Sequence, residues 1–290
     1  MNGFLLIDKP KGQTSADCVY TLRNILNTKK IGHCGTLDPI ATGMLPICIG
    51  EGTKFSNYIS NHSKKYEVTV LFGIETDSGD ITGKEISKNS SEITENDLKE
   101  ALSSFEGEIK QTPPMHSAIK FQGKPLYKWV RAGIYLKRDE RNVSISKLEI
   151  KSFVGNTEAV IKVSCSKGTY IRSLVESIGK KINTIATIKE LRRISVGEFK
   201  EEDLTLLESK EKSFYQQNLI NLDQALKGLP KILLDKIEVK KIRNGQKLDY
   251  NAREQIEGIV RLYEKEGFFI GLGNIDSSKR VSAKRLLTTK

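Results

Sequence analysis

The chain has 290 residues, 38% of them hydrophobic, which is enough for a substantial core and for two domains of ordinary size. Lys and Arg outnumber Asp and Glu by 47 to 36, and the net charge of +11 favours a polyanionic partner, usually nucleic acid. Lysines that only hydrate the surface are the alternative explanation of this charge. No apolar run has the length of a membrane span, and Asp8 and Lys9 interrupt the short apolar start, so we expect a soluble protein without a signal peptide or a membrane partner.

Cysteine and histidine usage narrows the chemistry further. The four cysteines, Cys18, Cys34, Cys48 and Cys165, form no CxxC pair, and scattered thiols suggest a reducing compartment, hence the cytoplasm. The chain has only three histidines, and none stands at metal-ligand spacing from a cysteine. We therefore expect no metal site.

Residues 33–43, HCGTLDPIATG, have the composition of a turn but carry one acid, Asp38, between Leu37 and Pro39. Apolar neighbours predict a partly desolvated carboxylate, whose pKa would rise unless a cation lay nearby. A structural aspartate here would cap a helix or close a turn, whereas a functional one needs a positive partner. Arg172 is a candidate partner, because apolar residues flank it instead of a charged run.

The glycine-rich segment 49–55, IGEGTKF, resembles a phosphate-binding loop only superficially. Its spacing fits neither the Walker motif nor the dinucleotide GxGxxG motif. We expect these glycines to let a helix begin close to a sheet, and we expect no nucleotide cofactor.

Two regular elements follow in chain order. Residues 66–72 alternate apolar and polar side chains, which predicts a half-buried strand with Tyr66 on its buried face. Thr94, with Asp97 three residues later, forms the capping-box pattern of a helix start. Apolar residues at helical spacing from Leu98 to Phe105 complete the pattern of an amphipathic helix.

Residues 120–141, KFQGKPLYKWVRAGIYLKRDER, interleave cations with aromatic side chains. Cations suit phosphates and flat rings suit unstacked bases, so this pattern favours RNA binding. The alternative is an amphipathic helix on the core, with Leu126, Val130 and Ile134 as its buried stripe. The two explanations are compatible.

Residues 158–165 alternate as a second strand, KGTY predicts a turn, and apolar residues from Ile171 to Ile182 recur at helical spacing. Tyr170 and Arg172 would therefore lie at the start of a helix. Because strands and helices mix without a regular βαβ order, we predict an α+β fold.

The last third of the chain changes character. The polar segment LESKEKSFYQQN, which begins at Leu207, has the composition of a connector. Residues 231–290 contain fourteen Lys or Arg against eight acids, a net +6 of the total +11. Their short alternating runs, separated by turn residues, predict a small β-barrel.

Five motifs occur in the order found in one known family. They are LLIDKPKGQTSAD (5–17), KIGHCGTLDPIATGMLPICIGEGTKF (30–55), KKYEVTVLFGIETDSGD (64–80), PPMHSAIKFQGKPLY (113–127) and CSKGTYIRSL (165–174). Together they closely resemble the bacterial tRNA pseudouridine synthase B family, over about residues 3–200. A weaker similarity, in IRNGQKL and GFFIGLGNID, resembles that family's C-terminal RNA-binding PUA barrel.

The resemblance implies a role for several residues of this sequence. Asp38 matches the catalytic aspartate, Arg172 the arginine that pairs with it, and Tyr66 the tyrosine that stacks on the target uracil. His33 matches a histidine that supports the flipped-out T-loop, Tyr170 and Leu191 match residues of the uracil pocket, and Lys9 with Pro10 matches a motif packed beneath the site. His116 departs from the family pattern, in which an aromatic residue is frequent there.

The implied architecture is a catalytic domain over residues 1–225 and a PUA-like domain over 231–290. The catalytic domain would have a mixed, largely antiparallel sheet flanked by helices and an RNA-binding thumb insertion at about 115–142. The implied activity is conversion of the T-loop uridine at tRNA position 55 to pseudouridine, without cofactor, metal or guide RNA, by a cytoplasmic monomer.

Three questions stay open at this stage. Asp38 could attack C1′, attack C6 of the base, or remove the C2′ proton. A tRNA-folding chaperone is a rival or accessory function, although binding alone has no use for a desolvated carboxylate. A guide-RNA-dependent synthase shares the GTLDP core, but the bacterial-type motifs and short C-terminal domain argue against it.

Overall fold

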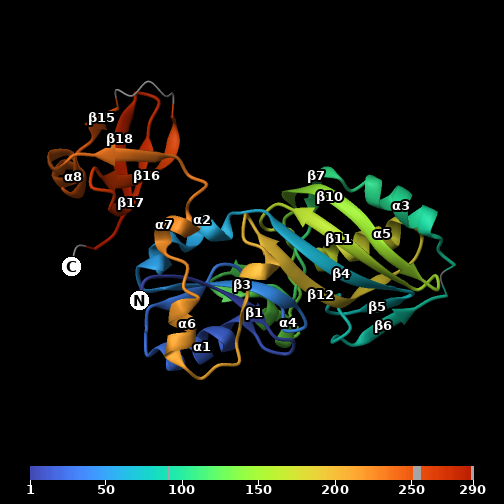
Figure 1. The fold of residues 1–290 in the computed structure, drawn as a ribbon. Helices are drawn as coiled ribbons and strands as arrows, with labels where there is room; N and C mark the ends of the chain where they lie inside the picture. Colours follow the sequence, from blue (N-terminus) through green and yellow to red (C-terminus); the bar gives the residue numbers. More distant parts are fainter. Residues whose placement is uncertain (91, 251–255, 289–290) are drawn as a thin grey trace.

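A computed structural model of the chain describes residues 1–90, 92–250 and 256–288, and its fold is α+β, as predicted (Figure 1). Residues 1 to about 225 form a large sheet with helices, and the residues after them form a small β domain. Among the described residues, no helix is both long and apolar enough to cross a membrane.

The large sheet has nine strands, which are β1 (Gly3–Lys9), β2 (Ile31–His33), β3 (Thr42–Ile49), β4 (Lys64–Phe72), β7 (Gly107–Gln111), β10 (Arg141–Val154), β11 (Glu158–Cys165), β12 (Ala186–Val196) and β13 (Thr205–Leu206). Their order is β13-β1-β3-β12-β4-β11-β10-β7, with β2 paired to β3. Only β1 with β13 and β3 with β12 pair in parallel, so the sheet is mixed and largely antiparallel.

The helices of this part are α1 (Ser15–Leu26), α2 (Ser56–Ser60), α3 (Glu95–Ser103), α4 (Leu126–Arg131), α5 (Ile171–Lys181), α6 (Lys212–Gln217), α7 (Leu222–Ala225) and the 3-10 turns η1 (Gly50–Phe55) and η2 (Glu201–Asp203). Two short hairpins, β5 (Ile74–Thr76) with β6 (Glu85–Lys88) and β8 (Lys120–Phe121) with β9 (Lys124–Pro125), lie outside the large sheet.

Segments whose local pattern predicted a strand or a helix form these elements in the structure. The side chains of β4 alternate between buried and partly exposed, and Tyr66 lies on the buried face. Thr94 and Asp97 make both hydrogen bonds of a capping box at the start of α3. Gly52 is required because a Cβ there would lie 2.4 Å from the Gly3 carbonyl oxygen, so η1 begins against the sheet as expected.

The segment predicted to be a connector packs into the core of the large domain. Residues 212–217 form α6, and Tyr215 is fully buried in the main hydrophobic cluster, donating its hydroxyl proton to the Ser209 carbonyl (2.9 Å). Ile220 then pairs with Phe4 next to the sheet. The polar composition hid this packing, which is made by Tyr215 together with Leu207, Phe214 and Leu219.

The small domain comprises β14 (Lys231–Leu234), α8 (Lys236–Arg243), β15 (Leu248–Asp249), β16 (Gly258–Glu264), β17 (Phe269–Ile275) and β18 (Arg280–Leu286). Its strands form a curled five-stranded sheet in the order β14-β16-β17-β18-β15. Part of the predicted C-terminal domain, residues 251–255 and 289–290, lies outside the described residues.

The two domains meet in an apolar and polar contact. Leu272 of β17 belongs to the same buried cluster as Phe55 and Leu222, and the Arg261 guanidinium pairs with Asp223 at 2.8 Å. Because both kinds of contact join the domains, the small domain has a defined position next to α2 and α7 (Figure 1).

Replacing Tyr215 tests whether α6 belongs to the core. Tyr215→Ala should lower the free energy of unfolding by about 3–5 kcal/mol, since a large buried ring is removed. Tyr215→Phe, which removes only the bond to Ser209, should cost about 1 kcal/mol. Urea unfolding of the full chain measures both, and a change under about 0.5 kcal/mol for Tyr215→Ala would mean that the segment is a connector after all.

Candidate active site

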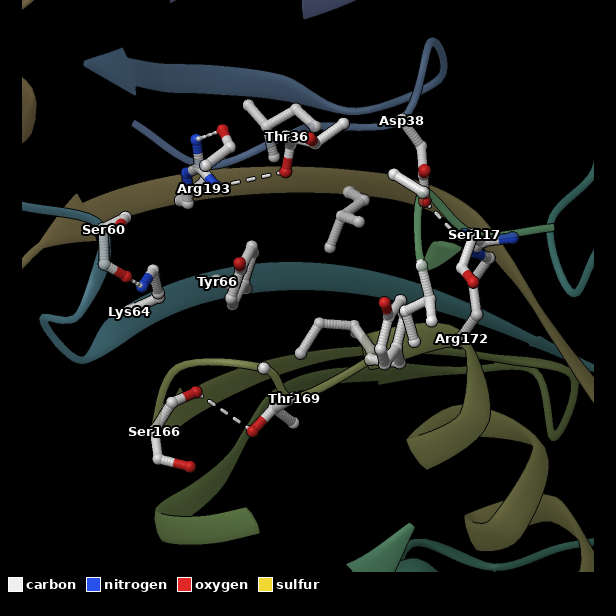
Figure 2. A pocket seen from close by; sticks show the side chains of 18 residues that line it. Thr36, Asp38, Ser60, Lys64, Tyr66, Ser117, Ser166, Thr169, Arg172 and Arg193 are labelled. Atoms are coloured by element: carbon white, nitrogen blue, oxygen red, sulfur yellow. Dashed lines mark hydrogen bonds and ion pairs between the residues drawn. The ribbon is translucent and has the colours of Figure 1, made fainter. Parts of the chain in front are cut away.

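A cavity of about 390 Å³ opens at the loop that carries Asp38 (Figure 2). Its walls come from six segments: the loop 35–38, Ser60 at the end of α2, the start of β4, residues 117–119, the turn 166–170 with the first turn of α5, and β12. Segments far apart in the chain therefore enclose one site.

Asp38 and Arg172 form an ion pair in this cavity, with 3.0 Å between Arg172 Nε and Asp38 Oδ2. The Arg172 side chain is 5% exposed and the Asp38 side chain 33% exposed. Nη1 of Arg172 donates to the Ser78 carbonyl (3.0 Å) and Nη2 to the His116 carbonyl (2.7 Å). The guanidinium thus fixes three segments, and the cation expected from sequence lies beside the acid.

The sequence left open whether the Asp38 side chain closes this turn. In the structure, backbone groups close it instead. The Ala41 N–H donates to the Asp38 carbonyl, at 3.0 Å. Ser15 Oγ accepts from the Leu37 N–H (2.9 Å) and lies 3.1 Å from the Leu37 carbonyl, to which it donates. The Asp38 carboxylate is therefore available for chemistry in the cavity.

Burial raises the pKa of the Asp38 carboxyl, and the Arg172 guanidinium opposes that rise. Asp80, which is buried close by, adds to the rise. Asp38 is consequently a more basic carboxylate than an exposed one, held in place by a cation.

Three further predicted residues line the cavity: Tyr66 from β4, Tyr170 at the start of α5 and Leu191 from β12. Tyr66 and Leu191 are buried, and burial raises the pKa of both tyrosines. Two rings and an aliphatic side chain give the cavity walls suited to a flat aromatic group.

Lys9 and His33 lie outside the lining. Lys9 is fully buried, and its Nζ donates to the carbonyls of Gln13 (2.6 Å), Pro10 (2.9 Å) and Pro39 (3.3 Å). Lys9 therefore supports the Asp38 loop from beneath. His33 lines a different cavity, with Tyr20 and Arg23, and its Nδ1 is buried without a partner among the described residues.

The polar residues of the cavity that sequence reasoning missed include Lys64, Ser117 and Arg193. Lys64 stands two residues before Tyr66, and Arg193 two residues after Leu191. Since side chains two apart on a strand share a face, this spacing could have revealed both cations. Ser117 belongs to a segment without regular structure, and no spacing rule indicates it.

The insertion at 115–142 differs from the amphipathic helix considered above. Its helix α4 has only six residues, and of the proposed stripe Leu126 is buried whereas Ile134 is exposed. Lys124 lies over the Trp129 ring, and Phe121 and Tyr135 are exposed. A surface of cations and aromatic rings is therefore the better description.

Comparisons with known proteins agree with this geometry. The model of the TruB family pseudouridylate synthase N-terminal domain matches residues 23–171, and two TruB C-terminal domain models match 172–233 and 230–287. The tRNA pseudouridine synthase B of Aromatoleum aromaticum is 41% identical over 100% of this chain and 94% of its own length. The corresponding protein of Chromobacterium violaceum is 40% identical over 100% and 96%.

Solved structures show the same fold. A Cbf5-Nop10-Gar1 complex contains a chain with a TM-score of 0.74 and 24% identity, covering 98% of this chain and 84% of that one. A chain of an H/ACA RNP bound to a substrate RNA also has a TM-score of 0.74, with 22% identity and coverage of 99% and 85%. With the full-length relatives and the matching domain models, this chain belongs to the TruB family of pseudouridine synthases.

Proposed function

We propose that this protein isomerises the T-loop uridine at position 55 of tRNA to pseudouridine, with Asp38 as the reacting carboxylate. The observation that carries the proposal is the Asp38–Arg172 ion pair at 3.0 Å inside a cavity walled by Tyr66. The relatives named tRNA pseudouridine synthase B support tRNA as the substrate.

The target uridine must leave the folded tRNA before Asp38 can reach it, because a stacked base is inaccessible to an enzyme side chain. Unstacking costs a few kcal/mol, and stacking on Tyr66 with backbone contacts to basic residues offsets it. Tyr170 and Leu191 would enclose the flipped uracil, and His33 would support the opened T-loop from a separate cavity.

The chemistry breaks the C1′–N1 bond, turns the uracil and joins C1′ to C5. No electrons enter or leave and no group is transferred, so the reaction needs no cofactor or metal. A carboxylate can form and break the bond at a sugar carbon, as in retaining glycosidases. Arg172 orients Asp38 and favours its ionised form. Attack on C1′, attack on C6 and removal of the C2′ proton all use this same carboxylate.

Basic surfaces outside the cavity would hold the tRNA elbow. The thumb insertion (115–142) presents exposed aromatic rings and cations, and the domain from residue 231 carries a net +6. We propose that one chain, acting as a monomer in the cytoplasm, recognises tRNA through these surfaces without a guide RNA.

Incubation with unmodified tRNA, with no other protein or RNA present, tests the activity. Wild type should form pseudouridine at position 55, and Asp38→Asn should form none while its Kd for tRNA changes less than about threefold, because the variant keeps the shape of the site. Asp203→Asn, at an exposed position outside the cavity, should retain wild-type activity. Substantial activity of Asp38→Asn would refute Asp38 as the reacting group.

The pH dependence should report the ionisation of Asp38. The single-turnover rate should rise with pH along an acid limb above the ordinary aspartate pKa of about 3.9, because burial raises the pKa of Asp38. Arg172→Gln removes the cation that opposes the rise and should move the limb to higher pH. Arg172→Lys keeps a cation and should move it less, whereas identical limbs in all three enzymes would contradict the assignment.

Exposed lysines of the small domain test its role. Replacing Lys240, Lys241 and Lys284 together by Gln should weaken tRNA binding and reduce the slope of log K against log salt by about 0.9 for each phosphate that is no longer neutralised. Substitution is preferable to deleting the domain, because Leu272 packs in the catalytic part. Activity on an isolated T-arm should persist, and an unchanged salt slope on full-length tRNA would exclude these lysines from the interface.

A further inference from the structure

The cavity has more positive charge than its one carboxylate can balance. Lys64, Arg172 and Arg193 line it, and Asp38 is the single acid among its described lining residues. Figure 2 shows Lys64 and Arg193 at one end and Asp38 with Arg172 at the other, with Tyr66 between them. The second end of the cavity is therefore cationic.

Lys64 and Arg193 are buried without an acidic partner among the described residues. Lys64 is 7% exposed, and its Nζ donates to the carbonyls of Ser60 (2.5 Å) and His62 (2.6 Å). Arg193 is 1% exposed and donates to the carbonyls of Met44 (2.7 Å) and Gly35 (3.1 Å). Backbone carbonyls fix their positions, but neither cation is neutralised.

Such an arrangement is costly in an apolar interior, where charged groups are normally paired. Burial and the neighbouring Arg193 lower the pKa of Lys64 to about 8, so Lys64 is still mostly protonated at neutral pH. An anion that forms in the cavity would relieve this cost. The proposed reaction generates such an anion.

Negative charge accumulates on the uracil ring along each route that Asp38 can take. When the C1′–N1 bond breaks, its electron pair stays on N1 and spreads to the carbonyl oxygens O2 and O4. Asp38 bonds to C1′ in one route and takes the C2′ proton in another, and uracil leaves as its anion in both. Addition of Asp38 to C6 places the charge on C5 and O4 instead. The open choice of route therefore does not affect this argument.

We propose that Lys64, aided by Arg193, stabilises the anion that forms on the uracil carbonyls while the glycosidic bond is rearranged. A base stacked on Tyr66 with its ribose at Asp38 directs its carbonyl edge toward the opposite end, where Lys64 and Arg193 lie. The charge disappears when C5 joins C1′. Asp38 then leaves C1′ or C6, or returns the proton to C2′, and the proton on C5 moves to N1. This inference rests on the proposed function and makes Lys64 a second catalytic residue.

The same cations could instead bind an RNA phosphate. The burial of Lys64 and Arg193 favours the base, because the flipped base fills the cavity while the backbone stays nearer its mouth. Removing a cation from a phosphate would weaken binding and reduce its salt dependence. Removing it from a developing anion would slow the reaction at saturating RNA.

Lys64→Met tests the proposal in single-turnover assays with a saturating T-stem-loop RNA. We expect the rate to fall about 10²-fold, the size found when one donor to a developing anion is removed, with Kd and salt slope unchanged. Lys64→Gln can keep hydrogen bonds to the Ser60 and His62 carbonyls but lacks the charge, so it should slow the reaction as much as Lys64→Met does. This second variant keeps the test valid if Lys64→Met misfolds. Lys64→Arg should recover part of the rate, and Lys65→Met, at an exposed neighbour on the same strand, should match wild type.

A substrate with a more stable uracil anion separates catalysis from packing. In RNA with 5-fluorouridine at the target position, fluorine withdraws electrons and stabilises the anion. The wild-type to Lys64→Met rate ratio for loss of the N-glycosidic nucleoside, measured by mass spectrometry, should therefore be at least fivefold smaller than with uridine. Any one of three results would overturn the proposal. The rate ratio could be equal with both substrates, both Lys64→Met and Lys64→Gln could react at the wild-type rate, or the effect could be confined to Kd and salt slope. Failure of wild type to form any pseudouridine would instead refute the proposed function.

Discussion

Arg172 is buried with its donors directed at three segments that are distant in sequence, and the site depends on this one side chain. Its contacts to the Ser78 and His116 carbonyls hold the loop after β5 and the start of the thumb insertion, while Nε pairs with Asp38. A buried guanidinium with unmet donors would be destabilising, so each segment must be in place for the ion pair to form. Folding at the base of the insertion and placement of the Asp38 carboxylate are thereby linked.

The Asp38 loop is held by contacts that leave its carboxylate free. Lys9 reaches the Pro39 carbonyl from below, Ser15 bonds to Leu37, and the turn itself is closed by Ala41. If the Asp38 carboxylate itself accepted a hydrogen bond from a backbone N–H of this turn, the bond would lower the pKa of Asp38 and make it a weaker base. In this fold Lys9, Ser15 at the start of α1 and the Ala41 N–H hold the loop instead, so the Asp38 carboxylate does not have to.

Local chemistry made much of this structure predictable. Alternation identified β4 and β11, the Thr94–Asp97 capping box located α3, and the turn before α5 placed Arg172 at a helix start. Long-range packing was not predictable. The polar segment around Tyr215 gave no sign of entering the core, and the partners of Lys64 and Arg193 are backbone carbonyls, which carry no sequence signature. Lys64 lies two residues from Tyr66, and Arg193 two residues from Leu191. Because side chains two apart on a strand share a face, this spacing could have placed both cations in the cavity.

The raised pKa of Asp38 and the lowered pKa of Lys64 have one cause, since removal of water disfavours both charged forms. A water-filled cleft would leave both groups nearer their ordinary pKa, but it would also solvate any charge on the base and weaken every fixed dipole around it. The burial that makes these charges costly is thus the condition under which a carboxylate at one end and cations at the other act strongly on a base between them. The large buried core around the nine-stranded sheet offsets that cost, because burial of its many apolar side chains stabilises the whole fold.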